Sequence, residues 1–599
     1  MKLTRLYSNK PEIFAPIEFR SGLSVILAEI RLPENQNRNV HNLGKSTVGL
    51  LIDFCLLKGK SKEFFLFKHE ELFEGFVFYL EIEADSGAYI TVSRSLESRD
   101  AISLLVSGES IADASAMAPA DWSHLGLGFA SAKTLLDGLL GITAATPWDY
   151  RSLMGYVLRE QADYGDVFHL KKFRGKQSEW KPFLAHVLGF DSASSTRLYE
   201  TIADVDRIDR DMIFLSRESG GPGDADVTTI DGLLAIRGRE AAELEATLES
   251  FDFSKVDSEA NRELVESVET QIAYLNEESY RLMNLLAKLG ESLAQDRIFF
   301  TTEEAATLFA QAGVAFAGQL KKDYDQLLEF NRSITEERRA YLLEERRSAE
   351  LRLAEIAHDL EAQQGERSRL FGFLEGSDTL EKYKQISRRL VTARANIESL
   401  NRQRGALARV IELRQQQRQV TERRNELQTA IENDVRAKAE SSDSTYVRIQ
   451  RYFDEIVHDV LDEHALLSVS VNTAGSLEFN AEIIDDSGTA TSGGRGFTYN
   501  KLLCVAFDLA LLRAYIDVPF PRFAFHDGVF ESLETRKKRT LLQLLRKYAG
   551  LGLQLIVTTL DSDLADPVDE GRDSIRRDEI VRVLHDEGSS GRLFDMDSW

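Results

Sequence analysis

The chain of 599 residues contains two cysteines and ten prolines, and it lacks long apolar runs. Cys55 and Cys504 both lie among apolar neighbours, so we expect buried, unreactive thiols and neither a disulfide framework nor a zinc site. No stretch of about 18 consecutive apolar residues occurs, which predicts that nothing spans a membrane. The first residues, MKLTRLYSNK, lack the apolar core of a secretory signal. We therefore expect a cytoplasmic protein.

The formal net charge is −25, with 43% hydrophobic and 29% charged residues. This composition is typical of a folded protein with much exposed helix, and the length exceeds that of one ordinary core. An acidic chain can still bind nucleic acid, but only through a local basic patch. The net charge by itself therefore excludes few functions.

The two ends of the chain predict α/β lobes. In residues 1–200, LSVILAEI (23–30) indicates a strand, STVGLLIDFCLL (46–57) a helix, and EGFVFYLEIEAD with AYITVSRSLES a pair of strands. In residues 445–599, LLSVSVNTAGSLEFNAEII (466–484) indicates a hairpin. RFAFHD (522–527) and LQLIVTT (553–559) are typical of buried strands.

Residues between these lobes predict a helical arm, since no proline occurs between Pro222 and the end of that region. Apolar residues recur there at spacings of four and three, the pattern of a coiled coil. The seam comprises Val268, Ile272, Leu275, Leu282, Leu286 and Leu289, then Leu353, Ile356 and Leu360, then Tyr383, Ile386, Leu390, Ala393, Ile397, Leu400, Leu407 and Ile411. We expect an outgoing part, interrupted by a helical module at 299–320, a tip near 365–378, and an antiparallel return. A helical spacer or bundle is the alternative.

The stretch NLGKST resembles the end of a phosphate-binding loop. Lys45 would reach the outer phosphates and Ser46 would bind Mg²⁺, while Gly44 permits close approach. Asn39, Asn42 and Thr47 are also expected to bind the nucleotide. Asn39 and Asn42 stand where glycines are common, and asparagine tolerates left-handed backbone angles. The alternative is a capped surface helix that matches by chance.

Two further features complete a nucleotide site. Asp527 ends a predicted strand, as a carboxylate near Mg²⁺ must, although such a residue is often only part of a turn. Ser492, Gly493 and Gly494 precede a long apolar helix, where backbone N–H groups can hold a γ-phosphate. A flexible turn is the alternative for this segment.

This order of motifs resembles the SMC-like ATPases of the ABC class, the group that includes RecF, RecN and the double-strand-break repair ATPases. Within it the chain is similar to short-armed bacterial members known mainly by a C-terminal domain of unknown function. The resemblance implies an α/β fold with a split ABC-type ATPase head: an N-terminal lobe (1–215), an inserted antiparallel coiled-coil arm (216–440) and a C-terminal lobe (441–599).

The resemblance also implies roles for individual residues. Lys45 and Ser46 match the Walker A lysine and magnesium-binding hydroxyl, and Asp527 matches the Walker B aspartate. Gln161 matches the Q-loop glutamine, which contacts Mg²⁺ and the attacking water. Ser492, Gly493 and Gly494 match the signature core. ATP and Mg²⁺ are the implied ligands.

Two positions depart from the family pattern. Gly528 stands where a catalytic glutamate should follow Asp527, so that either Glu531 or Glu534 would have to replace it. No switch histidine follows the last predicted strand, where Thr558, Thr559 and Asp561 stand instead. We therefore expect slow hydrolysis, because a general base contributes about a hundredfold to ten-thousandfold in rate. His526 is expected to be either a supporting group or a packed core residue.

The family arrangement implies a homodimer in which Ser492 completes the partner's nucleotide site. DNA binding is expected from the resemblance and from basic residues. These are Arg402, Arg404, Arg409, Arg414, Arg418, Arg423 and Arg424 in the arm, and Lys171, Lys172, Arg174, Lys176 and Lys181 with Phe173 and Trp180 after Gln161. A solvated coiled-coil face paired with glutamates is the alternative for the arm.

The leading hypothesis is an ATP-dependent DNA-binding or DNA-sensing ATPase of a bacterial genome-maintenance or anti-phage system, working with separate effector proteins. The alternative is a dimeric scaffold that binds nucleotide with little or no hydrolysis and recruits an effector.

Overall fold

The computed structural model describes residues 1–32, 35, 43–96, 102–170, 177–218, 227–250, 259–294, 318–371, 378–485, 487–488, 496–563 and 574–597. The chain forms two compact units. Unit 1 comprises 1–206 and 419–599, and unit 2 comprises 207–418. The boundaries between the units fall within the long helices α6 (Ser192–Glu218) and α11 (Asp378–Glu440). Unit 1 is therefore built from both ends of the sequence.

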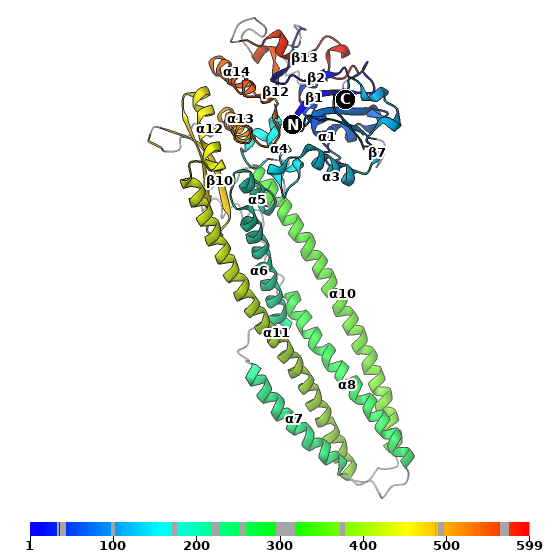
Figure 1. The fold of residues 1–599 in the computed structure, drawn as a ribbon. Helices are drawn as coiled ribbons and strands as arrows, with labels where there is room; N and C mark the ends of the chain where they lie inside the picture. Colours follow the sequence, from blue (N-terminus) through cyan, green and yellow to red (C-terminus); the bar gives the residue numbers. More distant parts are fainter. Residues whose placement is uncertain are drawn as a thin grey trace. The chain divides into compact units, whose positions relative to one another are not determined.

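A parallel sheet in unit 1 joins the two chain ends. Its strand order is β13-β3-β12-β11-β8, and every neighbouring pair is parallel. The strands are β3 (Leu23–Glu29), β8 (Leu158–Arg159), β11 (Phe523–His526), β12 (Gln554–Leu560) and β13 (Ile580–His585), drawn from blue to red in Figure 1. The central strands β3, β11 and β12 are buried along nearly their whole length and are mostly apolar, because both faces of the sheet are covered. The strands predicted at 23–30, 522–527 and 553–559 are confirmed.

An antiparallel sheet belongs to the N-terminal part of unit 1. Its order is β2-β1-β4-β5-β6-β7, and the strands predicted over EGFVFYLEIEAD and AYITVSRSLES pair as β4 and β5. The strands are β1 (Lys2–Ser8), β2 (Ile17–Glu18), β4 (Val77–Glu83), β5 (Tyr89–Ser95), β6 (Ile102–Ser107) and β7 (His124–Leu127). The predicted hairpin at 466–484 forms a separate ribbon of β9 (His464–Val471) and β10 (Leu477–Ile484).

Helices cover the sheets of unit 1. The longer ones are α1 (Lys45–Cys55), α3 (Phe129–Leu140), α5 (Gln177–Val187), α12 (Thr445–Leu461), α13 (Phe497–Ala514) and α14 (Thr535–Gly550), with short turns α2 (Phe65–Lys68) and α4 (Met154–Val157). Cys55 on α1 and Cys504 on α13 are buried, as predicted, and burial raises the pKa of each thiol to about 12. Among the described residues, no helix is long and apolar enough to cross a membrane.

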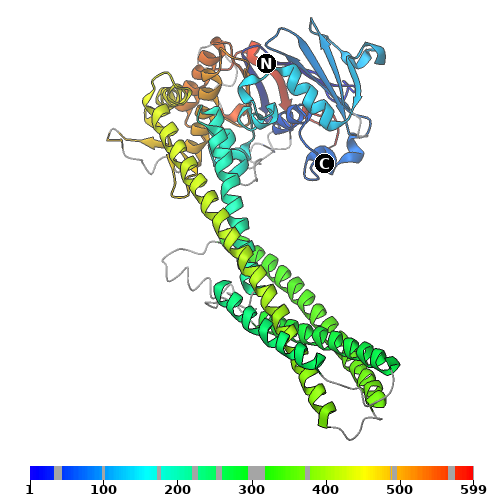
Figure 2. The same cartoon turned by 60° about the horizontal axis from the view of Figure 1, so that its bottom comes forward.

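Unit 2 consists of long helices. Besides its parts of α6 and α11, it contains α7 (Val227–Glu249), α8 (Glu259–Ala294) and α10 (Gly318–Phe371). Ion pairs Arg352–Glu278 and Arg367–Glu269 join α10 to α8 in antiparallel register. Figure 1 and Figure 2 both show these two helices side by side.

The arm therefore differs from the predicted path of one outgoing and one returning part. Because α8 and α10 are antiparallel, the chain reverses direction between them. The sequence had instead predicted that both belong to one outgoing part, interrupted only by a small helical module. Helix α7 pairs with α11, through Arg394–Glu245 and Arg404–Asp231. Residues 299–317 of that module and 372–377 of the predicted tip lie outside the described residues. The heptad pattern could not show the extra reversal, because it identifies an apolar face and not the helix that covers it.

Most seam residues are at least partly buried. Ile272, Leu289, Ile356, Leu390 and Ala393 are buried. Ile411 is wrongly placed in the seam, since it is 42% exposed while Val410 and Leu413 are buried. The helical register thus shifts within α11.

Candidate functional site

The site begins where α1 follows β3. Gly44 precedes the helix with φ of +92°, and a Cβ there would lie 2.7 Å from Leu593 Cβ. Only glycine fits both the backbone angle and this close contact. Lys45, the first helical residue, is 3% exposed, and Thr47 N–H donates to Gly44 O at 3.0 Å. Asn39 and Asn42 lie outside the described residues.

The carboxyl ends of the parallel strands bring the other residues to the same edge. Asp527 follows β11, Gln161 follows β8, and Thr558 lies in β12. Ser46 forms a side-chain hydrogen bond with Asp527, and Thr558 Oγ1 donates to Asp527 Oδ1 at 2.5 Å. Ligand sites of open α/β sheets lie at this edge.

Asp527 is 1% exposed, and burial raises the pKa of its carboxyl above the ordinary value. The hydrogen bonds from Ser46 and Thr558 and the charge of Lys45 oppose this shift. A buried carboxylate beside a serine hydroxyl is an all-oxygen donor set, which suits Mg²⁺. A bound cation would offset the cost of burying the negative charge.

Glu531 is the acidic residue that reaches this group. Its Oε1 lies 2.5 Å from Lys45 Nζ, and its two carboxylate oxygens accept hydrogen bonds from Gln161 Nε2 at 3.0 and 3.1 Å. Glu534 instead lies at the start of α14 and is exposed. Of the two predicted replacements for the missing glutamate, only Glu531 contacts Lys45 and Gln161.

The geometry at Gly528 explains why Glu531 reaches the site. Gly528 has φ of +62°, and a Cβ built there would lie 2.7 Å from Gln161 Nε2 and 2.8 Å from the carboxyl carbon of Glu531. The carboxylate of Glu531 thus occupies the space beside position 528. Gly528 N–H donates to Thr558 Oγ1 at 2.8 Å.

A buried ionic network supports the site, and sequence reasoning did not find it. Arg159 donates through Nε and Nη2 to the two carboxylate oxygens of Asp508, each at 2.7 Å, and His526 Nε2 lies 3.1 Å from Asp508 Oδ2. All three side chains are 0% exposed. The remaining donors of Arg159 bind the carbonyls of Asp163, Asp166 and Val167.

This network fixes the loop that carries Gln161. Burial alone would lower the pKa of Arg159, but the paired Asp508 raises it, so the guanidinium stays charged. His526 is buried, as both interpretations of this residue expected, and its contact with Asp508 makes it part of this network. The overlooked signals were a lone aspartate in the apolar run LLCVAFDLALL and the arginine two positions before Gln161.

Several predicted residues are not tested by this geometry. Ser492, Gly493 and Gly494 lie outside the described residues, as do Lys171, Lys172, Phe173, Arg174 and Lys176.

Four of the predicted basic residues are paired with carboxylates. The prediction that Lys181 contacts nucleic acid is wrong, because its side chain is 2% exposed and pairs with Glu478 at 2.9 Å. Arg402 and Arg409 pair with Glu398 and Glu412 of the same helix, and Arg404 pairs with Asp231 of α7. The alternative for the arm expected pairs with glutamates of another helix, and of these three arginines only Arg404 has a partner on another helix.

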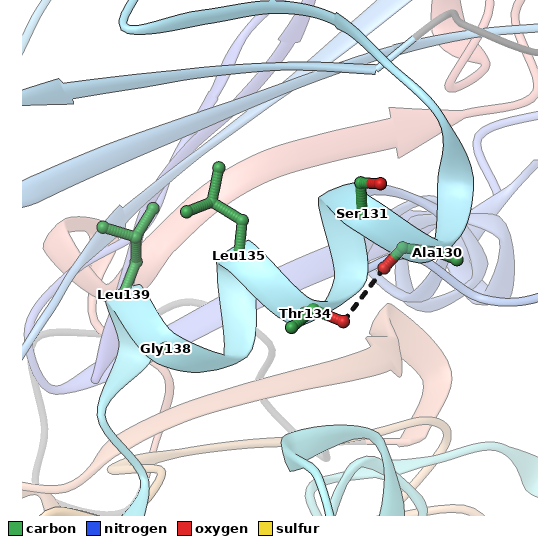
Figure 3. A pocket seen from close by; sticks show the side chains of 6 residues that line it. All are labelled: Ala130, Ser131, Thr134, Leu135, Gly138 and Leu139. Atoms are coloured by element: carbon green, nitrogen blue, oxygen red, sulfur yellow. Dashed lines mark hydrogen bonds between the residues drawn. The ribbon is translucent and has the colours of Figure 1, made fainter.

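A surface hollow elsewhere does not have the chemistry of a phosphate site. Figure 3 shows it on one face of α3, lined by Ala130, Ser131, Thr134, Leu135, Gly138 and Leu139. Thr134 Oγ1 donates to Ala130 O at 3.2 Å, and none of the six residues is charged. The polar group around Lys45 and Asp527 is the stronger candidate.

Residues 456–598 match a protein family described as "Uncharacterised protein conserved in bacteria (DUF2326)". This match agrees with the expected C-terminal domain of unknown function. No protein with a curated description matches the sequence.

Among solved structures, the chain is similar to the Smc head domain with a coiled coil and joint from Pyrococcus yayanosii. The identity is 15%, the TM-score is 0.36, and the match covers 93% of this chain and 92% of that chain. It is also similar to the Smc head domain with an extended coiled coil, bound to the C-terminal domain of ScpA, from Pyrococcus furiosus. There the identity is 12%, the TM-score is 0.30, and the coverage is 94% and 90%.

Proposed function

We propose that the chain is an SMC-like ATPase with an ABC-type head that binds ATP with Mg²⁺ and hydrolyses ATP slowly. One observation carries the proposal: Lys45 and Ser46 from the N-terminal part meet Asp527 and Glu531 from the C-terminal part, together with Gln161. This set combines a cation for phosphate, oxygen donors for Mg²⁺ and a carboxylate for water.

Each residue has a defined task in this proposal. The first turn of α1 offers backbone N–H groups and its positive dipole end to the phosphates, and Lys45 neutralises the outer phosphates. Ser46 and Asp527 would hold Mg²⁺, with Gln161 beside them. When bound, Mg²⁺ supplies positive charge that stabilises the transferring phosphoryl group.

Glu531 is the proposed general base. In the present structure its carboxylate is paired with Lys45, so bound phosphates must take over Lys45 before Glu531 can accept a proton from water. Gln161, which donates to both carboxylate oxygens, would orient Glu531. We expect this exchange of partners for Lys45 to slow turnover even though a catalytic carboxylate is present.

The wider assignment follows from the resemblance rather than from the site. We propose an ATP-dependent homodimer through the heads, in which Ser492, Gly493 and Gly494 approach the partner's nucleotide. We further propose DNA binding and a role with separate effector proteins in bacterial genome maintenance or anti-phage defence. If phosphate contacts carry the DNA affinity, that affinity falls steeply as salt rises.

The alternative function is a nucleotide-gated scaffold that recruits an effector with little or no hydrolysis. Gly528 favours it, because the position after Asp527 provides no carboxylate of its own. Under this alternative, Glu531 would serve only as the counter-ion of Lys45 in the nucleotide-free state.

Substitutions at Lys45, Glu531 and Glu534 test the proposal. We expect Lys45→Ala to abolish ATP binding, measured with a fluorescent ATP analogue. Glu531→Gln should keep binding and lower phosphate release about a hundredfold to ten-thousandfold, since it removes only the base. Glu534→Gln tests the other residue predicted as the general base, and it should change turnover less than about threefold.

Three outcomes would contradict the proposal or one of its parts. Absence of ATP binding by the wild-type protein contradicts any nucleotide-dependent function. Binding and ATP-dependent dimerisation without phosphate release support the scaffold. If turnover is lost in Glu534→Gln but not in Glu531→Gln, the general base is Glu534 and the assignment to Glu531 is wrong.

A further inference from the structure

A buried lysine on α13 lies directly behind the turn that carries Glu531. Lys501 is 3% exposed, and its Nζ donates to Gly528 O at 2.9 Å and to Glu531 O at 3.1 Å. One ammonium group therefore binds both ends of residues 528–531. No nucleotide-binding motif of the sequence includes Lys501.

The turn itself is tight and depends on these ends. Glu531 N–H donates to Gly528 O at 3.2 Å, and Gly528 has a positive φ of +62°. This geometry folds the chain back, so that the carboxylate of Glu531 reaches Lys45 and Gln161. A small rotation of the turn would move the carboxylate away from both partners.

Burying the charged ammonium group of Lys501 costs free energy of desolvation, which an apolar residue at this position would avoid. Burial lowers the pKa of Lys501, and the nearby charges of Glu531, Asp563 and Asp527 oppose the shift. Methionine has a similar length and would fill the same space without this cost. What methionine lacks is the pair of hydrogen bonds to the turn.

The same end of α13 also binds the loop that carries Gln161. Asn500 Nδ2 donates to Tyr164 O at 2.9 Å, and Lys501 Nζ lies 5.3 Å from the centre of the Tyr164 ring. Consecutive residues of one helix thus contact the loops of Glu531 and of Gln161. These contacts give the two side chains a common support.

We propose that Lys501 is a positioning residue for ATP hydrolysis, which holds the 528–531 turn so that Glu531 substitutes for a carboxylate at position 528. The inference rests on the proposed ATPase function and adds the residue that makes the relocated carboxylate effective. Lys501 contacts neither nucleotide nor water in this account. It acts through the backbone of Glu531.

A double-mutant cycle tests whether Lys501 acts through Glu531. Lys501→Met should lower kcat by about a hundredfold, because a carboxylate displaced by about 1 Å loses that much rate. The dissociation constant for ATP should change less than about threefold, since Lys45 and Ser46 remain in place. In the Glu531→Gln background, Lys501→Met should lower kcat less than about twofold, because no base remains to be positioned.

Further variants separate positioning from a general loss of structure. Lys501→Arg keeps donors toward the turn and should recover about tenfold of the kcat that Lys501→Met loses. Lys547→Met removes an exposed lysine of the same unit, paired with Glu455 and Asp459, and should leave kcat unchanged. If Lys501→Met does not fold, as judged by its thermal transition, Lys501→Arg in both Glu531 backgrounds provides the cycle.

The outcomes distinguish this inference from the function on which it rests. A wild-type protein that binds ATP but releases no phosphate overturns the ATPase proposal and this inference with it. Wild-type turnover with unchanged kcat in Lys501→Met overturns the inference alone. An equal loss of kcat in the wild-type and Glu531→Gln backgrounds also overturns it, because Lys501 would then act independently of Glu531.

Discussion

At the scale of single residues, the site is determined by positions where side-chain size is critical. Gly528 adopts a left-handed backbone angle and leaves room for Glu531 and Gln161. Gly44 likewise combines a positive φ with close contact to Leu593. A glycine directly after Asp527 thus leaves the space that the carboxylate of Glu531 occupies.

We predict that a glutamate introduced at position 528 lowers activity instead of raising it. In Gly528→Glu the new Cβ meets Gln161 and Glu531, and the left-handed backbone adds about 1–2 kcal/mol of strain. Phosphate release and urea unfolding measure the two effects. Gly528→Ala introduces only the Cβ and should show the same direction. Faster hydrolysis by Gly528→Glu would show that the turn adapts and that Glu531 is dispensable.

At the scale of elements, α1 packs very close to β11, the strand that ends directly before Asp527. Gly49 of α1 faces Phe525 of β11, and a Cβ there would lie 2.4 Å from Phe525 Cε1. This contact sets the distance between Ser46 at the start of α1 and Asp527 after β11. The packing of one glycine against one ring therefore shapes the proposed Mg²⁺ site.

We predict that Gly49→Ala destabilises the protein although alanine favours helix. Overpacking against Phe525 should cost about 1–3 kcal/mol in the free energy of unfolding, measured by urea denaturation. Gly138→Ala in α3 is the matched control, because a Cβ there meets nothing within 4 Å. The control should gain about 0.4–1 kcal/mol. Equal gains in both variants would contradict the close packing of α1 on β11.

At the scale of the whole molecule, the two compact units differ in how they are built. Unit 1 combines both chain ends in one parallel sheet, while unit 2 is formed by helices of the middle region. All residues of the candidate site lie in unit 1. A ligand that binds there should stabilise unit 1 selectively, since binding only to the folded state shifts the unfolding equilibrium.

We predict that ATP with Mg²⁺ raises the thermal transition of unit 1 in differential scanning calorimetry. At a hundred times the dissociation constant, the stabilisation is about 2.7 kcal/mol. Lys45→Ala and removal of Mg²⁺ with EDTA should abolish or reduce the shift. Arg352→Ala, which removes an exposed ion pair of unit 2, should keep it. A shift that persists in Lys45→Ala would place the nucleotide elsewhere.

Local sequence patterns predicted much of the secondary structure. Runs of β-branched and apolar residues identified β3, β11 and β12, and the alternation in 74–98 identified β4 and β5. These predictions succeed because a strand or helix imposes its period on neighbouring residues. The motif NLGKST and the strand ending at Asp527 also predicted that Lys45, Ser46 and Asp527 lie in one site.

Other features arise only from contacts between distant residues. The sequence alone left Glu531 and Glu534 as equal alternatives, but the turn at Gly528 brings only Glu531 to Lys45. Neither the buried pair Arg159–Asp508 nor the support of the turn by Lys501 has a local pattern, since the partners lie far apart in the chain. Spacing within a segment reveals which face is buried. Only the packed fold decides which charged group meets which partner.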